Sequence, residues 1–157
     1  MITPTNKNRQ NLPGYKVQFE RNTSFFGIKK CVKHEIDIVV YNATGDEKYA
    51  IELKYPRNGQ YPEQMYSFIK DIAFMEELKQ YGFTDTFVMT VVDDKNLYCG
   101  KYSRNDIYRF FRGHELISGK IEKPTGHAPE SIFVKGSYFI NWTEGPNDRK
   151  VYILKIQ

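Results

Sequence analysis

The chain has 157 residues, of which 40% are hydrophobic and 27% are charged, a balance typical of a globular protein with one hydrophobic core. Twelve tyrosines, eleven phenylalanines and one tryptophan exclude a chain that is disordered throughout. The net charge of +4 is compatible with a polyanionic partner but does not require one.

The sequence lacks the signals of membrane insertion and secretion. No apolar run approaches the roughly 18 residues that span a membrane, and the stretch MITPTNKNRQNLPG has no apolar signal-peptide core. Cys31 and Cys99 lack the spacing of a metal or redox site. We therefore expect a cytoplasmic protein with no membrane association and two reduced thiols, although a single disulfide between them stays open.

The first third of the chain predicts three strands. Residues 1–13 are polar, which favours a mobile arm or an irregular lead-in. Residues 15–20 alternate in polarity, and residues 33–42 and 47–56 are rich in Ile, Val and Tyr between Asn, Gly and Pro. The short polar stretch NATGDE predicts that the second and third strands pair as an antiparallel hairpin.

A long helix and a further strand are predicted next. Apolar residues recur at helical spacing from Met65 to Leu78, Pro62 suits the first helical turn, and Gly82 suits the end. Residues 85–94 form a nearly continuous apolar run, which is typical of a strand buried on both faces.

The C-terminal part predicts a second helix over residues 103–113, with Ser103 as its N-cap and Asp106 in the capping-box position. Residues 131–142 and 150–157 are predicted to form a closing β-hairpin through the turn TEGPNDR.

Together these elements predict an α/β fold, with a mixed β-sheet flanked by helices and an added C-terminal β-hairpin. Residues 113–130 are rich in turn signals and receive no assignment. No repeat or linker divides the chain, so a single domain is expected over residues 1–157.

Charged residues lie inside the two strands of the predicted hairpin. Because side chains of a strand alternate between faces, Glu52 and Lys54 project from the same face of the third strand. A simple hairpin register adds Glu35 and Asp37 of the second strand to that face. The opposite face consists mostly of Ile, Leu, Val and Tyr and is predicted to pack under the helix.

A compact group of carboxylates beside a lysine has the parts that phosphodiester hydrolysis needs. Neighbouring carboxylates repel one another, and a hard cation such as Mg²⁺ (or Mn²⁺) relieves that repulsion by accepting their oxygens as ligands. Such a metal polarises a phosphoryl oxygen and lowers the pKa of bound water. A lysine beside it helps to deprotonate the water or offsets the charge that develops on the phosphorus centre.

These residues resemble the D…(D/E)xK signature of the PD-(D/E)xK nuclease superfamily, whose members have restriction-endonuclease-like folds. The similarity lies in EID, which contains Asp37, followed fifteen positions later by the ELK of Glu52 and Lys54. The order of elements over residues 15–94 is also similar to that family's core, with residues 95–157 as a C-terminal elaboration. The residue before Asp37 is Ile36, whereas the PD of the family's motif has proline at this position.

The resemblance implies roles for individual residues. Asp37 and Glu52 would bind the metal, the backbone carbonyl of Leu53 would be a further ligand, and Lys54 would be the catalytic lysine. An acidic residue from an N-terminal element joins the cluster in many members. That residue would be Glu20 as first choice and Glu35 as second, although no helix is predicted before the first strand, where the family has one.

Two neighbouring segments complete the predicted site. The stretch GQYPEQMYSF resembles the Gln-containing helix start of RecB-like members, which implies Gln64 near the site, with Gln60 as the alternative. The position four residues after Gln64 is Phe68, where those members have tyrosine. The stretch YPRNG is first a turn, and second a loop that offers Arg57 and Asn58 to phosphates.

The resulting prediction is a metal-dependent nuclease that acts on nucleic acid, with DNA favoured over RNA. The alternative is a catalytically inactive nuclease-fold module that binds nucleic acid or a protein partner. A homodimer is left open as well. A simpler interpretation of Glu52 and Lys54 is a solvated cross-strand ion pair, but Asp37 argues against it because aspartate is unfavourable inside a strand.

Overall fold

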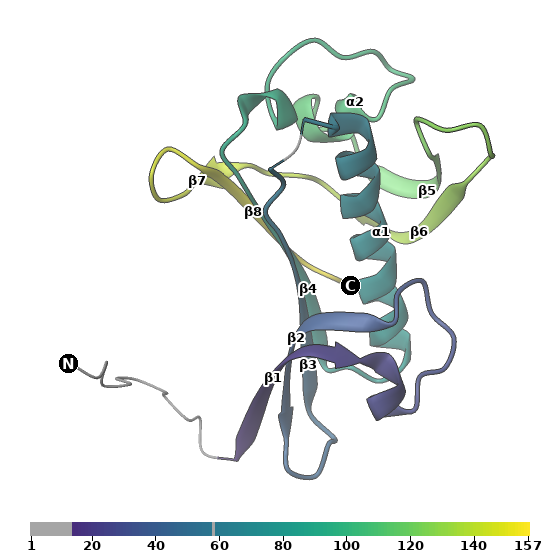
Figure 1. Ribbon diagram of the computed structural model, residues 1–157, viewed down its shortest axis with the longest axis vertical. Coiled ribbons are helices and arrows are strands. Elements are labelled where there is room, and N and C mark those ends of the chain that lie inside the picture. The colour runs from purple at the N-terminus through teal and green to yellow at the C-terminus, as the bar shows by residue number, and fades with distance from the viewer. Residues whose placement is uncertain (1–13, 58) are drawn as a thin grey trace, which may run out of the picture.

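The computed structural model describes residues 14–57 and 59–157 (Figure 1). The predicted lead-in over residues 1–13 and the predicted phosphate contact Asn58 lie outside the described residues. The elements are, in chain order, β1 (Tyr15–Asn22), η1 (Thr23–Phe26), β2 (Glu35–Asn42), β3 (Lys48–Lys54), α1 (Tyr61–Gln80), β4 (Asp85–Val92), η2 (Lys95–Leu97), α2 (Tyr108–Arg112), β5 (Ile117–Glu122), β6 (Ser131–Tyr138), β7 (Thr143–Glu144) and β8 (Lys150–Lys155).

Six strands form a mixed sheet in the order β1-β2-β3-β4-β8-β7, so the protein is mixed α/β with mostly β-structure. The predicted hairpin is confirmed, since β2 and β3 pair antiparallel with Ile38 opposite Ile51. The side chain of Asn42 holds its turn by accepting hydrogen bonds from the N–H groups of Gly45 (2.8 Å) and Glu47 (3.2 Å). Strands β3 and β4 are parallel, and α1 forms the long connection that a parallel pair requires.

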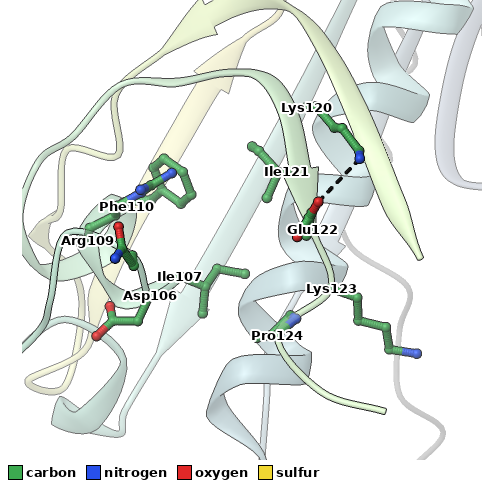
Figure 2. A pocket seen from close by; sticks show the side chains of 10 residues that line it. Asp106, Ile107, Arg109, Phe110, Lys120, Ile121, Glu122, Lys123 and Pro124 are labelled. Atoms are coloured by element: carbon green, nitrogen blue, oxygen red, sulfur yellow. Dashed lines mark hydrogen bonds and ion pairs between the residues drawn. The ribbon is translucent and has the colours of Figure 1, made fainter. Parts of the chain in front are cut away.

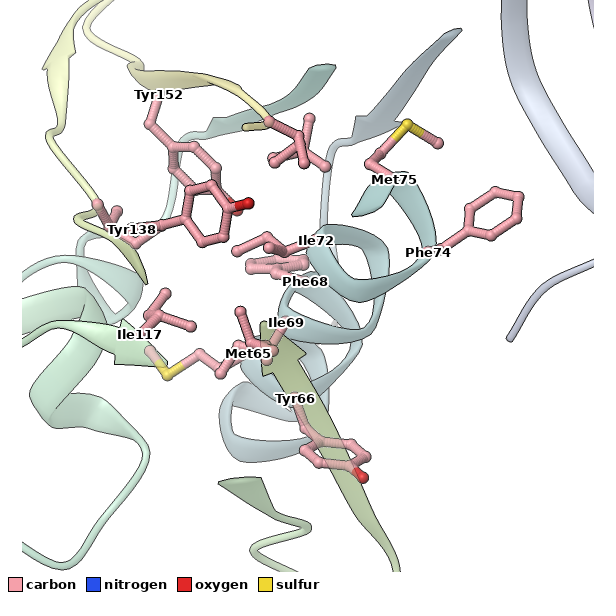
Figure 3. Packing of buried hydrophobic residues seen from close by; sticks show 14 of the residues in the cluster. Met65, Tyr66, Phe68, Ile69, Ile72, Phe74, Met75, Ile117, Tyr138 and Tyr152 are labelled. Atoms are coloured by element: carbon pink, nitrogen blue, oxygen red, sulfur yellow. The ribbon is translucent and has the colours of Figure 1, made fainter. Parts of the chain in front are cut away.

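The long helix α1 is also confirmed, and it packs on one face of the sheet. Its predicted apolar stripe from Met65 to Leu78 is buried. Figure 3 shows Ile72 of this stripe directed toward the rings of Tyr138 and Tyr152, which belong to β6 and β8. Each large side chain buried in this way contributes roughly 1.5–3 kcal/mol, so the stripe anchors the sheet to the C-terminal elements. None of the helices in the described ranges is both long and apolar enough to cross a membrane.

The second helix is shorter than predicted. It begins at Tyr108 with Ile107 as the N-cap residue, so the prediction of Ser103 as N-cap is wrong. The N–H group of Ser103 instead donates to the carboxylate of Asp106 at 2.7 Å. This contact is half of a capping box, but it closes a turn ahead of the helix.

The predicted C-terminal hairpin is wrong. Strand β6 pairs with β5, from the unassigned segment, in a separate two-stranded sheet. Strand β8 pairs with β4 and with the short β7. Tertiary packing accounts for this choice. The ring of Tyr152 in β8 lies 4.9 Å from that of Trp142 within the core beside β4, while β6 packs against α1.

Strand β4 is buried on one face only, which contradicts the prediction of burial on both. Its burial alternates residue by residue, with Thr86 among the buried positions and Phe87 among the partly exposed ones. The hydroxyl of Thr86 donates to the backbone carbonyl of Met75 in α1 at 2.9 Å. The buried face of β4 is therefore the face that α1 covers.

The face of β3 under the helix is the reverse of the predicted one. Ala50 and Glu52 pair with the buried side of β4 and are themselves buried, whereas Leu53 on the other face is 41% exposed. The helix covers this face because Ala50 allows its close approach and because the ammonium of Lys33, in the segment before β2, pairs with Glu52.

A second buried carboxylate, Glu76 of α1, ties the helix to β6. It accepts hydrogen bonds from the N–H groups of Lys135 (2.9 Å) and Gly136 (2.6 Å) and from the hydroxyl of Tyr138 (3.0 Å). Hydrogen bonds to a charged group contribute about 1.5–3 kcal/mol each.

We expect Glu76→Gln to lower the free energy of unfolding by about 2 kcal/mol in urea titrations, because the amide loses the charge that three donors share. The matched control is Glu122→Gln, whose carboxylate is exposed on β5 and which should change stability by less than about 0.5 kcal/mol. Equal and small effects of both substitutions would contradict a tethering role for Glu76.

Candidate active site

Asp37 lies where β2 and β3 stop pairing. The regular register of this pair reaches Ile38 opposite Ile51, and continuing it by one position brings Asp37 opposite Glu52. Side chains replace the backbone ladder at this position. The N–H of Leu53 donates to Oδ2 of Asp37 at 2.8 Å, and the N–H of Asp37 donates to Oε1 of Glu52 at 3.3 Å. The two predicted metal ligands are therefore neighbours.

The alternation of β2 is interrupted at the same place. Ile36 and Val39 are both fully buried although they are three residues apart. Glu35 is exposed, and the prediction that it shares the face of Glu52 is wrong because Ile36 takes the buried position. Glu20 on β1 is also exposed, with a left-handed backbone (φ 50°), and within the described residues it forms no hydrogen bond or ion pair with Asp37 or Glu52.

Two lysines and a third carboxylate complete a cluster with Glu52. Asp71 projects from α1, and its Oδ1 lies 3.0 Å from the Nζ of Lys33 while its Oδ2 lies 3.3 Å from the Nζ of Lys54. Lys33 also donates to Oε2 of Glu52. We call Asp37, Glu52, Asp71, Lys33 and Lys54 the carboxylate–lysine cluster.

The cluster carries three carboxylates and two ammonium groups, and both burial and these charges act on the protonation of Glu52. Burial is the largest cause that raises the pKa of Glu52, to about 7, and the charges of Asp71 and Asp37 raise it further while Lys33 opposes them. Burial alone would lower the pKa of Lys33, but attraction by Asp71 and the hydrogen bond to Glu52 outweigh it and raise that pKa. Near neutral pH the ammonium of Lys33 is therefore retained, whereas the ionised form of Glu52 is disfavoured.

A groove of about 400 Å³ lies beside the cluster. Its lining residues are Lys33, Lys54, Glu63, Tyr66, Ser67, Lys70, Asp71, Lys123 and Glu130. Glu130 holds two of these lysines, at 3.4 Å from Lys70 and 3.0 Å from Lys123. The groove thus presents ammonium groups next to Asp71, an arrangement suited to a polyanionic chain that passes the carboxylates.

Another hollow, of about 450 Å³, lies between α2 and β5 (Figure 2). Its charged groups include Arg109 and an ion pair of 3.2 Å between Lys120 and Glu122. None of the site residues predicted from the sequence lines this hollow, so we place the candidate site at the carboxylate–lysine cluster.

The remaining predicted residues lie around the cluster. Gln64 is in the first turn of α1, about 10 Å along the helix from Asp71 at 1.5 Å per residue. Gln60 is the N-cap residue of the same helix. Arg57 is exposed in the loop after β3, with its guanidinium 5.6 Å from the centre of the Tyr55 ring.

Sequence reasoning missed Lys33 and Asp71. A signal for Asp71 exists, because it stands three residues after Phe68 and four before Met75, which places a carboxylate on the apolar stripe of the helix. Lys33 precedes β2 in an irregular segment, where no periodicity predicts the direction of a side chain.

The donor atoms of the cluster match Mg²⁺ in kind, since Asp37, Glu52 and the Leu53 carbonyl offer hard oxygen ligands. Their arrangement is not that of a formed metal site: residues 14–57 and 59–157 contain no group of three or more His, Cys, Asp or Glu side chains placed to hold a metal ion. Lys33 accounts for this, because its ammonium lies between Glu52 and Asp71. A metal at Glu52 would require this ammonium to move toward the groove that Lys33 also lines.

Comparison with known proteins gives no match of any kind: no family model, no curated protein and no solved structure matches the chain.

Proposed function

We propose that this protein is a metal-dependent nuclease of the PD-(D/E)xK type, with a restriction-endonuclease-like fold, that hydrolyses phosphodiester bonds in DNA in preference to RNA. The observation that carries the proposal is the meeting of Asp37, Glu52 and Lys54 with Asp71 beside a lysine-lined groove. The succession of three antiparallel strands, the helix α1 and the parallel strand β4 supports the same proposal.

In this proposal Asp37, Glu52 and the backbone carbonyl of Leu53 would hold Mg²⁺ or Mn²⁺. When bound, the metal would polarise a phosphoryl oxygen and lower the pKa of an attacking water. Burial and the neighbouring carboxylates raise the pKa of Glu52, and this supports the assignment because a divalent cation would stabilise the ionised carboxylate.

The residues of the chain supply the remaining functions. Lys54, held 3.3 Å from Asp71, is placed to donate to a phosphate oxygen and to offset the charge that develops there. Lys33 and Lys70 line the groove and would attract the phosphates that flank the attacked bond. Hydrolysis then forms a bond from the water oxygen to phosphorus and breaks the bond from phosphorus to the leaving nucleoside oxygen.

The second candidate is a catalytically inactive module that binds nucleic acid or a protein partner through the same groove. The specific observation in its favour is the ion pairing of Lys33 with both Glu52 and Asp71, which offsets part of the charge of these buried carboxylates without a metal.

The experiment that separates these functions is incubation of the protein with plasmid DNA, single-stranded DNA and RNA in Mg²⁺, Mn²⁺ or EDTA. A nuclease should cleave with either metal and stop in EDTA, and the substrate series shows whether DNA is preferred. Absence of cleavage on all three substrates, together with binding that persists in EDTA, would overturn the nuclease and support the binding module.

A further inference from the structure

One face of the six-stranded sheet has no described element over it. Helix α1 packs on the opposite face, and α2, η2 and β6 pack in turn against α1 (Figure 1). On the uncovered face Phe19 of β1 is 69% exposed and Ile153 of β8 is 61% exposed, although these strands lie on opposite sides of the sheet. We call this surface the open sheet face.

The open sheet face is more apolar than the face that α1 covers. In β4 the covered positions include two threonines, Thr86 and Thr90, whereas the open positions between Asp85 and Val92 are Phe, Met and Val. In β3 the covered face carries Ala50 and Glu52, and the open face carries a tyrosine, an isoleucine and a leucine. A sheet with one solvated face normally shows polar residues on that face, and the open sheet face lacks them on β3 and on β4 between Asp85 and Val92.

The apolar character is continuous across five strands. The register places the open-face side chains in adjoining rows. These side chains are Val17, Phe19, Ile38, Val40, Tyr49, Ile51, Leu53, Phe87, Met89, Val91, Val151 and Ile153. Five strands at about 4.8 Å spacing make a surface about 20 Å wide. A single helix, about 10 Å in diameter, would leave half of it exposed.

We propose that the open sheet face is the interface of a homodimer, in which two copies stack their sheets face to face. Four of its side chains, Val17, Phe19, Leu53 and Ile153, are 41–69% exposed and together present roughly 350–550 Å² per copy at about 150–250 Å² for a fully exposed large side chain, and the half-buried side chains of the same face add to this area. A standard interface buries about 800 Å² per partner. An identical sheet matches the width of the face, and two apolar sheet faces pack about 10 Å apart.

The surface has the relief that such packing needs. A shallow hollow of about 610 Å³ on this face is lined by Leu53, Lys54, Tyr55, Met89, Val91 and Arg149. Phe19 and Ile153 are among the most exposed large apolar side chains of the described residues, and protruding side chains of this kind fill such hollows in stacked sheets. The groove lies on the side that α1 covers, and of the described residues Lys54 alone lines both the groove and this hollow.

The test is the mass of the full-length protein in solution, measured by sedimentation equilibrium from 1 to 100 µM. We expect the wild-type protein at twice the 18.5 kDa mass of one chain. Ile153→Lys and, separately, Phe19→Lys should raise the dissociation constant by about 100-fold or more, since two-fold symmetry places each new charge in the interface twice.

The matched control is Phe133→Lys, because Phe133 is 62% exposed but belongs to β6 of the separate two-stranded sheet. This variant should remain dimeric, and circular dichroism should show the same fold for all variants. A wild-type protein that stays monomeric at 100 µM would overturn the proposal. So would folded Ile153→Lys and Phe19→Lys variants that dimerise as tightly as the wild type. Both outcomes are independent of nuclease activity.

Discussion

Replacing Lys54 by alanine is expected to lower Mg²⁺-dependent DNA cleavage by about 1,000-fold or more, and replacing Asp37 by alanine should have a similar effect. Lys54 would no longer offset charge on the attacked phosphate, and Asp37 would no longer hold the metal beside Glu52. The measurement is the initial rate of plasmid relaxation at saturating Mg²⁺, with unfolding followed in parallel to show that the fold persists.

Asp37 needs a second variant because its carboxylate also accepts the N–H of Leu53. Asp37→Asn keeps an acceptor for this hydrogen bond while it removes the charge, so it should fold as the wild type and still fail to cleave. Lys120→Ala is the control for a lysine outside the groove, since Lys120 is exposed on β5. Wild-type cleavage rates in both Lys54→Ala and Asp37→Ala would refute the assignment of the site.

The second large effect concerns stability and the charge of Glu52. The pKa of Glu52 in the folded protein, about 7, lies above its ordinary value of 4.5 because of burial and the neighbouring carboxylates. Below pH 4.5 both folded and unfolded forms hold the proton, so there is no cost. Between pH 4.5 and 7 the unfolded form loses the proton first, and stability falls as pH rises. Above pH 7 the loss of stability caused by ionised Glu52 is constant. It amounts to roughly 3 kcal/mol, because each unit of difference between the folded pKa and the ordinary pKa corresponds to about 1.36 kcal/mol.

Glu52→Gln should remove this dependence. In urea titrations at pH 5 and pH 8, the wild type should lose about 2–3 kcal/mol more of its unfolding free energy than the variant does. Because the difference between the two proteins isolates one group, other titrating residues cancel to first order. Equal losses in the two proteins would show that Glu52 ionises normally in the folded state.

The same pair of proteins tests metal binding without any substrate. A bound divalent cation would reduce the repulsion between Glu52 and the neighbouring carboxylates. Addition of 10 mM Mg²⁺ at pH 8 should therefore raise the melting temperature of the wild type and leave that of Glu52→Gln unchanged. No shift in the wild type would argue against Glu52 as a metal ligand.

Local pattern was sufficient for the elements whose partners are close in the chain. The hairpin of β2 and β3 follows from two apolar runs around a six-residue polar turn, and α1 follows from its helical spacing and its Pro62 start. The nearness of Asp37 and Glu52 is a consequence of that hairpin register, so both could be named from the sequence.

Elements whose partners are distant could not be assigned in this way. Strand β8 pairs with β4, more than fifty residues earlier, and β6 pairs with β5 instead of β8. Each of these strands presents an apolar face that several partners would satisfy, and only the combined packing around α1 selects one. The predicted capping residues Ser103 and Asp106 do form a hydrogen bond, but no helix begins at Ser103.

The sequence by itself determined the hairpin, the long helix and the pair of carboxylates with Lys54, because these depend on periodicity and short loops. Tertiary structure alone decided which face of the sheet the helix covers, and with it the surroundings of Glu52. Alternation shows only that two faces exist, and the face that is buried is the one on which Lys33 pairs with both Glu52 and Asp71. The apolar face left on the other side is a result of the same choice.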